Sequence, residues 1–316
     1  MITVLTGGTG GAKFVEGVAK NIDPKDLTCV VNTGDDMRWW GLYVSPDLDS
    51  ITYALAGLLS RERGWGLEGE TFNCLKRMGS LGAESWFQIG DLDLATHLRR
   101  TELMSSGLTL SDVTRKMAAA LNVTATILPM SNASVETRVR TPHGELSFEE
   151  YFVRERYQST VLEVHFVGAG EAKPAPGVID AIQKAEIVLL APSNPVTSIG
   201  PILSIPGVRD SLRTTPAPVV AVSPIVAGAA VSGPSGDLMR AMDMHNSAAG
   251  VAEAYRDFID VLIIDDRDAG ESSRIEELGV HPFPTQALMR TAEEKTALAK
   301  AAIEAARQHA RKAQGS

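Results

Sequence analysis

The sequence predicts an α/β protein with a doubly wound, mostly parallel sheet, and two observations carry this prediction. Short apolar runs alternate along the chain with amphipathic helical stretches, and the runs are apolar at nearly every position. Strands that are covered on both faces have this continuous pattern. The runs also end in glycine, small polar residues or carboxylates, which suits the ligand-binding edge of such a sheet. We expect one Rossmann-like domain over residues 1–316, with a hairpin and helical insertion at approximately 135–168.

The predicted elements of the first half alternate from the start of the chain. Residues 2–6 (ITVLT) form a buried strand, because the run is short, β-branched and stops at glycine. The stretch 12–20 fits an amphipathic helix, since Phe14, Val15 and Val18 fall on one face. The elements that follow are a strand at 27–33, helices at 48–59 and 108–122, and a strand at 124–131.

A different pattern occupies the middle of the chain. The sequence VETRVRTPHGELSFEEYF, residues 135–152, alternates polar and apolar residues and predicts a hairpin with its turn near Pro142, His143 and Gly144. The stretch 161–168 alternates as well. The α/β pattern then returns with strands at 185–193, 217–224 and 260–268, helices near 236–257, and a last helix from about residue 291.

Composition and charge exclude several classes of protein. The 316 residues include 30 lysines and arginines against 39 aspartates and glutamates, a net charge of −9, so we expect no nucleic-acid partner. No run of about 18 apolar residues occurs, so we expect no membrane span. Cys29 and Cys74 form no CxxC pair, and the first residues show no secretion-signal pattern. These features predict a cytoplasmic protein that acts on small molecules.

Five small residues, Gly7, Gly8, Thr9, Gly10 and Gly11, follow the first predicted strand. Glycines let backbone N–H groups approach an anion closely, and the next helix adds its N-terminal dipole. The spacing fits neither the dinucleotide pattern G-x-G-x-x-G nor the Walker pattern, because Lys13 stands at the third glycine and is followed by Phe14. A tight turn remains the alternative, but five small residues favour a phosphate-binding loop. Lys13 either contacts phosphate or faces solvent.

Four aspartates fall in one short segment. Asp35 and Asp36 follow the second predicted strand, and Asp47 and Asp49 lie where Pro46 predicts the start of a helix. Asp47 or Asp49 could cap that helix. Alternatively the two segments fold together and present oxygen atoms to Mg²⁺, which takes one or two carboxylates together with substrate phosphates.

A third polar cluster lies in WFQIGDLDLATHLRR, residues 86–100. Asp93 could cap a helix, with His97 one turn later on the same face. A single helical histidine is more often structural than a ligand. Trp39, Trp40 and Trp86 lie close to the polar clusters in sequence and could stack on a flat ligand. The chain has neither G-x-S-x-G nor a metal-type histidine pair, which speaks against an acyl hydrolase and a zinc enzyme.

Seven blocks together resemble one family. In order they are TGGTGGAKFVEGV, VVNTGDD, GLYVSPDLDSITYALAG, WFQIGDLDLATHLRR, GLTLSDVT, LPMSN and LAPSNPVTSIGPIL. Their collinear set, through at least residue 235, resembles the 2-phospho-L-lactate transferase family of coenzyme F-420 biosynthesis. The resemblance implies a doubly wound, Mg²⁺-dependent homodimer. It also implies that the terminal ribityl hydroxyl of 7,8-didemethyl-8-hydroxy-5-deazariboflavin attacks the phosphorus of a phosphoacid carried on guanosine diphosphate, with release of GMP.

The same resemblance assigns roles to matching residues. Asp49 and Gln88 should contact the deazaflavin, although many relatives carry lysine where this chain has Gln88. Asp36 and Asp49 are the expected metal ligands, with Asp35 and Asp47 as alternates, and Asp49 should also orient the attacking hydroxyl. The residues expected to hold the guanosine diphosphate part are Gly7, Gly8, Thr9, Gly10, Gly11, Lys13, Ser193 and Asn194.

Two questions stay open at the level of sequence. The transferred acid could be a phospholactyl, phosphoenolpyruvyl or 3-phosphoglyceryl group, and nothing in the sequence decides among them. The alternative function is a non-catalytic metabolic regulator of a related family that binds a nucleotide sugar. An NAD-dependent dehydrogenase is disfavoured by the glycine spacing.

Overall fold

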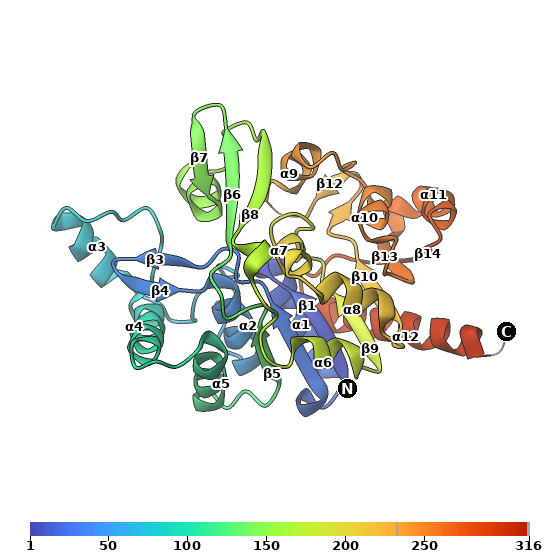
Figure 1. Cartoon of the computed structure of the whole chain (residues 1–316), viewed down its shortest axis with the longest axis horizontal. Coiled ribbons are helices and arrows are strands. Elements are labelled where there is room, and N and C mark those ends of the chain that lie inside the picture. The colour runs from blue at the N-terminus through green and yellow to red at the C-terminus, as the bar shows by residue number, and fades with distance from the viewer. Residues whose placement is uncertain (232, 315–316) are drawn as a thin grey trace.

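The computed structural model describes residues 1–231 and 233–314, so Ser232, Gly315 and Ser316 of the predicted 1–316 domain lie outside the described residues. Its centre is a seven-stranded sheet in the order β14–β13–β10–β9–β1–β2–β5, with every neighbouring pair parallel (Figure 1). The strands are β1 Ile2–Thr6, β2 Leu27–Val31, β5 Thr126–Pro129, β9 Ile187–Leu190, β10 Val219–Val222, β13 Val261–Asp265 and β14 His281–Thr285. The predicted parallel sheet is thus confirmed.

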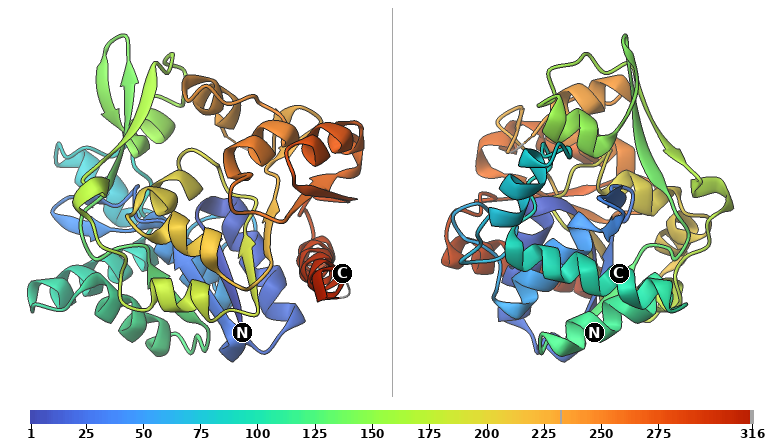
Figure 2. Two further views of the ribbon diagram at one scale, coloured as in Figure 1. Left: turned by 45° about the vertical axis from the view of Figure 1, so that its right-hand side comes forward. Right: turned by 90° about the vertical axis from the view of Figure 1, so that its left-hand side faces the viewer.

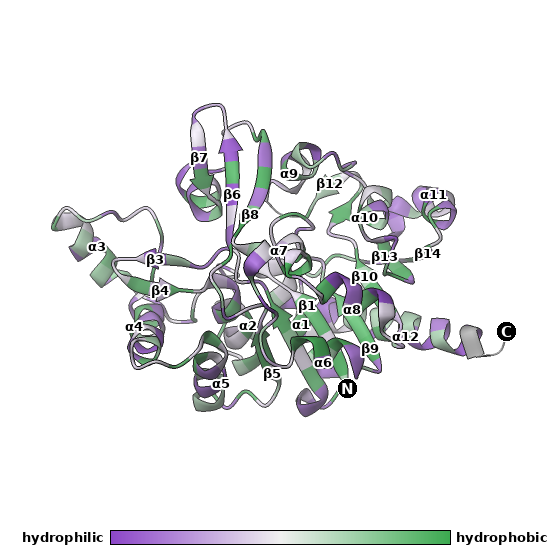
Figure 3. Cartoon of the chain, viewed as in Figure 1, coloured by the Kyte–Doolittle hydropathy of each residue, from purple (hydrophilic) through white to green (hydrophobic). Residues whose placement is uncertain are grey.

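Helices cover both faces of this sheet, because neighbouring strand residues point to opposite sides. Val4 of β1 packs in one core with α1, α2, α5 and α12, whereas Leu5 packs in the other with helices from α6 to α11. Figure 3 shows the sheet strands as largely hydrophobic between the two layers. The helices are α1 Gly8–Asn21, α2 Pro46–Ala56, α3 Asn73–Ser80, α4 Asp91–Ser105, α5 Leu110–Ala120, α6 Val178–Gln183, α7 Ile199–Ser204, α8 Val208–Thr214, α9 Ser235–Ala241, α10 Ala248–Tyr255, α11 Ser272–Glu277 and α12 Ala292–Gln314. The doubly wound architecture is confirmed.

The strand order places a topological switch point between β1 and β9. From β1 the chain proceeds outward through β2 and β5, and from β9 it proceeds the other way through β10, β13 and β14. Connections that diverge in this way leave a crevice at the carboxyl ends of the two central strands, where ligands bind in such folds. The two edge strands carry prolines, Pro129 in β5 and Pro282 and Pro284 in β14, which is where a sheet tolerates a missing N–H donor.

A separate antiparallel sheet stands at the place of the predicted insertion. Strands β6 Glu136–Thr141, β7 Gly144–Ser147 and β8 Glu163–Val167 pair in the order β7–β6–β8, and a π-helix follows β7 at Glu150–Arg154. This sheet projects from the carboxyl edge of the main sheet (Figures 1 and 2). The N–H of Thr137 donates to the carbonyl of Gly34 at 2.7 Å, which ties the insertion to the segment after β2.

Several local predictions were wrong or incomplete. The predicted helix at 12–20 begins at Gly8, so most of the predicted glycine loop is the first turn of α1. The helices predicted near 236–257 are confirmed as α9 and α10. A two-stranded hairpin, β3 Met37–Trp39 with β4 Leu42–Val44, was not predicted, because Trp40 and Gly41 supply positive φ angles of 51° and 79° without the usual Asn-Gly signal. A second short hairpin, β11 Ile225–Val226 with β12 Ala229–Ala230, was also missed.

Candidate functional site

The carboxyl ends of β1 and β9 are joined at the switch point. The Ser193 hydroxyl donates to the carbonyl oxygen of Gly7 at 2.7 Å and accepts the Gly7 N–H at 3.3 Å. Asn194 accepts the N–H groups of Val196 and Thr197 through its side-chain oxygen, at 2.9 and 3.3 Å, and so shapes the next turn. Ser193 and Asn194, which were predicted to hold the nucleotide, therefore follow β9 at the switch point, and Ser193 bonds directly to Gly7. Both side chains also stabilise the local backbone by hydrogen bonds. Their nucleotide contact stays a prediction.

Close packing explains several of the glycines. A Cβ on Gly7 would lie 2.5 Å from Asp47 Oδ2, one on Gly10 would lie 2.7 Å from the carbonyl oxygen of Pro192, and one on Gly11 would overlap Thr6 Oγ1. Gly8 has φ +67°, a region that favours glycine. The tight-turn alternative thus accounts for these positions. Phosphate binding remains compatible with them, because the N–H groups of Thr9 and Gly10 in the first turn of α1 have no helical carbonyl to bond.

Asp47 caps a helix, but not the one it belongs to. Its Oδ1 accepts the N–H of Gly8 at 2.7 Å, at the start of α1, and its Oδ2 accepts the Asn32 amide at 2.9 Å. The same Asn32 amide donates to Asp35 Oδ2 at 2.9 Å. Asn32, which the sequence did not single out, therefore holds two of the four predicted aspartates side by side at the ends of β1 and β2. The expectation that Asp47 caps its own helix was wrong in this detail.

Three buried carboxyl groups gather here, and none of them forms an ion pair with a basic side chain that the structure describes. Asp35, Asp47 and Glu149 are all buried, and the charge of Asp47 raises the pKa of both other carboxyl groups. Burial, and next the charge of Asp47, raise the pKa of Glu149 to about 8, and burial raises the pKa of Asp47 to about 6. Burial, then Asp47 and Glu149, also raise the pKa of Asp35 well above its ordinary value. Glu149 comes from the insertion, and no local sequence signal could have found it.

Asp36 lies at the mouth of the same region and is half-buried. Its carboxylate accepts the Tyr43 hydroxyl at 2.8 Å and the Ser45 hydroxyl at 2.5 Å, so the β3–β4 hairpin and the start of α2 hold it in place. Burial raises the pKa of Asp36 to about 8, although both hydroxyl bonds and the charge of Arg100 act in the opposite direction. Asp49 raises that pKa as well, which places the two predicted metal ligands within electrostatic range of each other.

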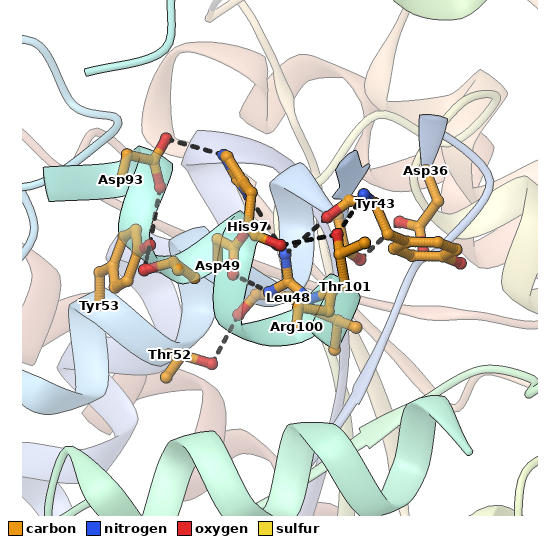
Figure 4. Close-up of polar contacts among 12 residues, drawn as sticks. Asp36, Tyr43, Leu48, Asp49, Thr52, Tyr53, Asp93, His97, Arg100 and Thr101 are labelled. Atoms are coloured by element: carbon orange, nitrogen blue, oxygen red, sulfur yellow. Dashed lines mark hydrogen bonds and ion pairs between the residues drawn. The ribbon is translucent and has the colours of Figure 1, made fainter. Parts of the chain in front are cut away.

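Asp49 is paired with Arg100 of α4 (Figure 4). Arg100 Nη1 donates to Asp49 Oδ2 at 3.0 Å, and Nη2 donates to Oδ1, so the guanidinium and the carboxylate form a bidentate ion pair. Both residues are buried, with 6% of Asp49 and 3% of Arg100 exposed. Burial alone would lower the pKa of Arg100, but Asp49 holds that pKa above its ordinary value. The sequence singled out Asp49 but gave no sign that Arg100 pairs with it.

His97 lies between two carboxylates in the same network. Its Nδ1 is 3.6 Å from Asp49 Oδ2 and its Nε2 is 3.3 Å from Asp93 Oδ2. Asp93 also accepts the Tyr53 hydroxyl at 2.7 Å. Ligand atoms of Asp49, Asp93 and His97 lie within 4.8 Å of one another, a spacing that could suit a metal ion. The guanidinium of Arg100 already occupies this neighbourhood, and its positive charge opposes a cation there.

The donor set for a hard cation can be tested against these contacts. Mg²⁺ requires oxygen ligands with free lone pairs. Asp35 Oδ1 is buried and has no hydrogen-bond partner among the described residues, and Asp36 is the accessible carboxylate beside it in sequence. Asp47 has bonds on both oxygens, and Asp49 is balanced by Arg100. Asp36 likewise accepts a hydroxyl on each oxygen, so Asp35 is the least engaged of the four aspartates. This oxygen-rich set fits an oxygen-preferring cation.

Trp39, Trp40 and Trp86 pack in one small cluster with Leu94 of α4, and Gln88 lies two positions after Trp86 in the chain. Gln88 is exposed, and its predicted contact with the deazaflavin stays a prediction. Trp39 and Trp86 meet edge to face at a centroid distance of 4.7 Å, and neither buried indole N–H has a partner in the part of the chain that the structure describes. Arg154 of the insertion lies 5.8 Å from the centroid of the Trp86 ring. The insertion therefore reaches the tryptophan cluster.

The fold and this site define a doubly wound α/β protein whose polar side chains gather at the switch point. Residues 2–305 match the family described as 2-phospho-L-lactate transferase CofD, and the chain belongs to this family. It is 40% identical over 302 residues to the 2-phospho-L-lactate transferase of Methanosarcina mazei, covering 96% of this chain and 99% of that protein. It is 39% identical over 311 residues to the phosphoenolpyruvate transferase of Streptomyces griseus, covering 96% and 98%. The predicted family is confirmed.

Comparison with solved structures supports the fold. A Bacillus halodurans protein of the UPF0052 family superposes with a TM-score of 0.65 at 19% identity, covering 96% of this chain and 98% of that one. At this identity the likeness shows the shared fold alone. Within the described residues, no helix combines the length and the apolar character that a membrane crossing requires.

Proposed function

We propose that the protein transfers a phospho-organic-acid group from a guanosine diphosphate-linked donor to the terminal ribityl hydroxyl of 7,8-didemethyl-8-hydroxy-5-deazariboflavin in coenzyme F-420 biosynthesis. The observation that carries the proposal is the family match over residues 2–305. The gathering of polar groups at the switch point of the sheet supports it. In the reaction the hydroxyl oxygen forms a bond to the phosphorus that bears the acid, the bond from that phosphorus to GMP breaks, and the hydroxyl proton is released.

Different residues of the site would bind the phosphates and orient the attacking hydroxyl. The N–H groups of Thr9 and Gly10 and the ammonium of Lys13 would bind the phosphates, next to Ser193 and Asn194. Asp49, held rigidly by its partners, would orient the attacking hydroxyl. No covalent nucleophile is required, because phosphoryl transfer depends mainly on positioning and charge neutralisation.

A divalent cation belongs to the proposal as well. Asp36 and Asp49, with Asp35 and Asp47 as alternates, would hold Mg²⁺, and of these Asp35 has one oxygen without a hydrogen bond among the described residues. When bound, this ion would neutralise charge on the pyrophosphate of the donor. The homodimer that the family resemblance implies is likewise part of the proposal.

The identity of the transferred acid stays open among three candidates. Relatives of nearly equal identity bear the names 2-phospho-L-lactate transferase and phosphoenolpyruvate transferase, so overall identity does not separate the donors. The phospholactyl, phosphoenolpyruvyl and 3-phosphoglyceryl groups differ by a small substituent. One such group is worth only about 1–3 kcal/mol of discrimination in a pocket.

The test supplies the purified protein with Mg²⁺, the deazaflavin and each of the three guanylylated acids in turn, and weighs the products. We expect one acid to give the phosphodiester together with an equal amount of GMP. Absence of product with all three would refute the transferase, and absence of deazaflavin fluorescence change at high protein concentration would then favour the non-catalytic regulator. A parallel reaction with chelator should stop; unimpaired transfer would show that the carboxylates act by hydrogen bonding alone.

A further inference from the structure

The contact between Arg100 and His97 defines which imidazole nitrogen carries the proton. Arg100 Nη1 lies 3.3 Å from His97 Nδ1. A guanidinium has only donors and stays charged, so Nδ1 must accept this hydrogen bond and carries no hydrogen itself. The ring proton therefore sits on Nε2, which lies 3.3 Å from Asp93 Oδ2. His97 is thus an acceptor toward Arg100, whereas Nε2 meets Asp93 at an ion-pair distance without the alignment of a hydrogen bond.

Asp93 is itself held in place, so it can fix this form of the ring. The Tyr53 hydroxyl donates to Asp93 Oδ1 at 2.7 Å and contacts the Thr96 hydroxyl at 2.6 Å. The carboxylate of Glu70 accepts the N–H groups of Leu92 and Asp93, at 2.6 and 3.1 Å, and caps the start of α4. Asp93 is 9% exposed and His97 is 1% exposed. Water therefore has little access to compete for either group.

The chain of contacts ends on the carboxylate of Asp49. His97 orients one arm of the Arg100 guanidinium, and Arg100 grips both oxygens of Asp49 (Figure 4). We propose that Asp93 and His97 are positioning residues, which act through Arg100 to fix the Asp49 carboxylate for the transfer. This inference rests on the proposed function. It also assigns His97 a role other than metal ligand, because Nδ1 faces the Arg100 guanidinium, whose positive charge opposes a cation there.

The tautomer of His97 provides a test that does not depend on activity. Nitrogen NMR of the labelled protein distinguishes an imidazole protonated on Nε2 from one protonated on Nδ1. We expect the Nε2-protonated form in the wild type. We expect Asp93→Asn to shift the Nε2 resonance, because the negative charge that faces this nitrogen is lost, while Arg100 keeps Nδ1 without a proton. A wild-type ring protonated on Nδ1 would overturn the inference, even if the phosphoacid substrate has not been identified.

Steady-state kinetics provide the second test. Each variant is assayed at a temperature well below its own melting temperature, so that only folded protein is compared. His97→Leu removes the acceptor and should lower kcat by roughly a hundredfold, the scale of a small misplacement, while KM for both substrates changes little. His97→Asn places an amide oxygen near the Nδ1 position and should recover most of that loss. Arg99→Gln, a change at the exposed neighbour that pairs with Glu102, is the control and should behave as wild type.

The outcomes separate the inference from the proposed function. A wild-type protein that forms no product contradicts the proposed transfer, whereas the NMR measurement still decides the orientation of His97. Wild-type kcat in His97→Leu would overturn the positioning role. A folded His97→Asn as inactive as the leucine variant would overturn it too, because the ring would then act on its own. If His97→Leu does not fold, Asp93→Asn and His97→Asn carry the kinetic comparison.

Discussion

Ser193 and Gly7 hold each other by two hydrogen bonds across the switch point of the sheet. The serine hydroxyl both donates to the glycine carbonyl and accepts the glycine N–H. Both bonds require the backbone at Gly7 to lie close to Ser193. Gly10 and Gly11 lie equally close to the loop after β9, at Pro192 and Ser193. The first turn of α1 is therefore placed by packing, before any ligand binds.

Gly10→Ala tests this packing. The added Cβ would lie 2.7 Å from the carbonyl oxygen of Pro192, and a backbone atom cannot move aside cheaply. We expect a loss of about 1–3 kcal/mol in the free energy of unfolding, as in overpacked cores. Gly170→Ala is the matched control, since nothing lies within 4 Å of its Cβ position. Denaturant titration of both variants decides; equal stability would show that the approach of Gly10 to Pro192 does not require glycine.

The fold was predictable because its signal is local. Each strand of the main sheet is a short apolar run, and each run is buried on both faces, so the pattern in the sequence reports the layer directly. The 37–44 hairpin was missed because its turn uses Trp40 and Gly41, and a tryptophan with positive φ has no sequence signature.

The site was predictable only as a list of residues. Asp35, Asp36, Asp47 and Asp49 stood out because they follow strands or begin a helix. Their partners did not, because the contacts are long-range: Arg100 lies 51 positions from Asp49 in the chain. Glu149 follows β7 of the separate antiparallel sheet, and its neighbour Glu150 looks identical in sequence. Only the folded chain shows that one is buried beside aspartates while the other pairs with Arg154.

Asp49→Asn should affect both activity and stability. The change removes the charge that balances Arg100, and breaking a buried ion pair on one side typically costs about 3–5 kcal/mol. We expect a large fall in kcat and a clearly lower melting temperature, measured by turnover and by calorimetry. Asp180→Asn, which breaks an exposed pair with Lys184, serves as the comparison and should change little. An asparagine variant with full turnover would refute the role of Asp49.

Glu149→Gln should change how stability depends on pH. The pKa of Glu149 is about 8 in the folded protein, against an ordinary value of 4.5. The folded state therefore binds this proton more tightly than the unfolded state, so its stabilising effect is present in full at acidic pH and is lost as the pH rises toward 8. Each unit of displacement corresponds to about 1.4 kcal/mol. The melting temperature of the glutamine variant should rise relative to that of wild type as the pH increases from 5 to 8. The melting curves are recorded with chelator, so that no divalent cation binds the carboxylates.

Glu150→Gln is the control for that experiment. Burial acts to raise the pKa of Glu150, but hydrogen bonds from Ser147 and the charge of Arg154 hold the pKa below its ordinary value. The sign is therefore opposite, and Glu150→Gln should gain nothing over wild type at higher pH. If the melting temperatures of Glu149→Gln and wild type change with pH in the same way, the surroundings of Glu149 do not disfavour its charged form.

Lys13→Met tests the phosphate contact. Lys13 lies one helical turn after Thr9 on the same face of α1, is half-buried, and has no hydrogen bond or ion pair with any residue that the structure describes. A charged hydrogen bond to phosphate is worth about 1.5–3 kcal/mol, so its loss should raise KM for the nucleotide-linked donor about tenfold or more. The melting temperature should hardly change, because no internal contact is lost. Lys20→Met, at the exposed end of the same helix, should leave KM unchanged. If both variants keep the wild-type KM, Lys13 faces solvent, and the backbone N–H groups at the start of α1 must bind the phosphates without it.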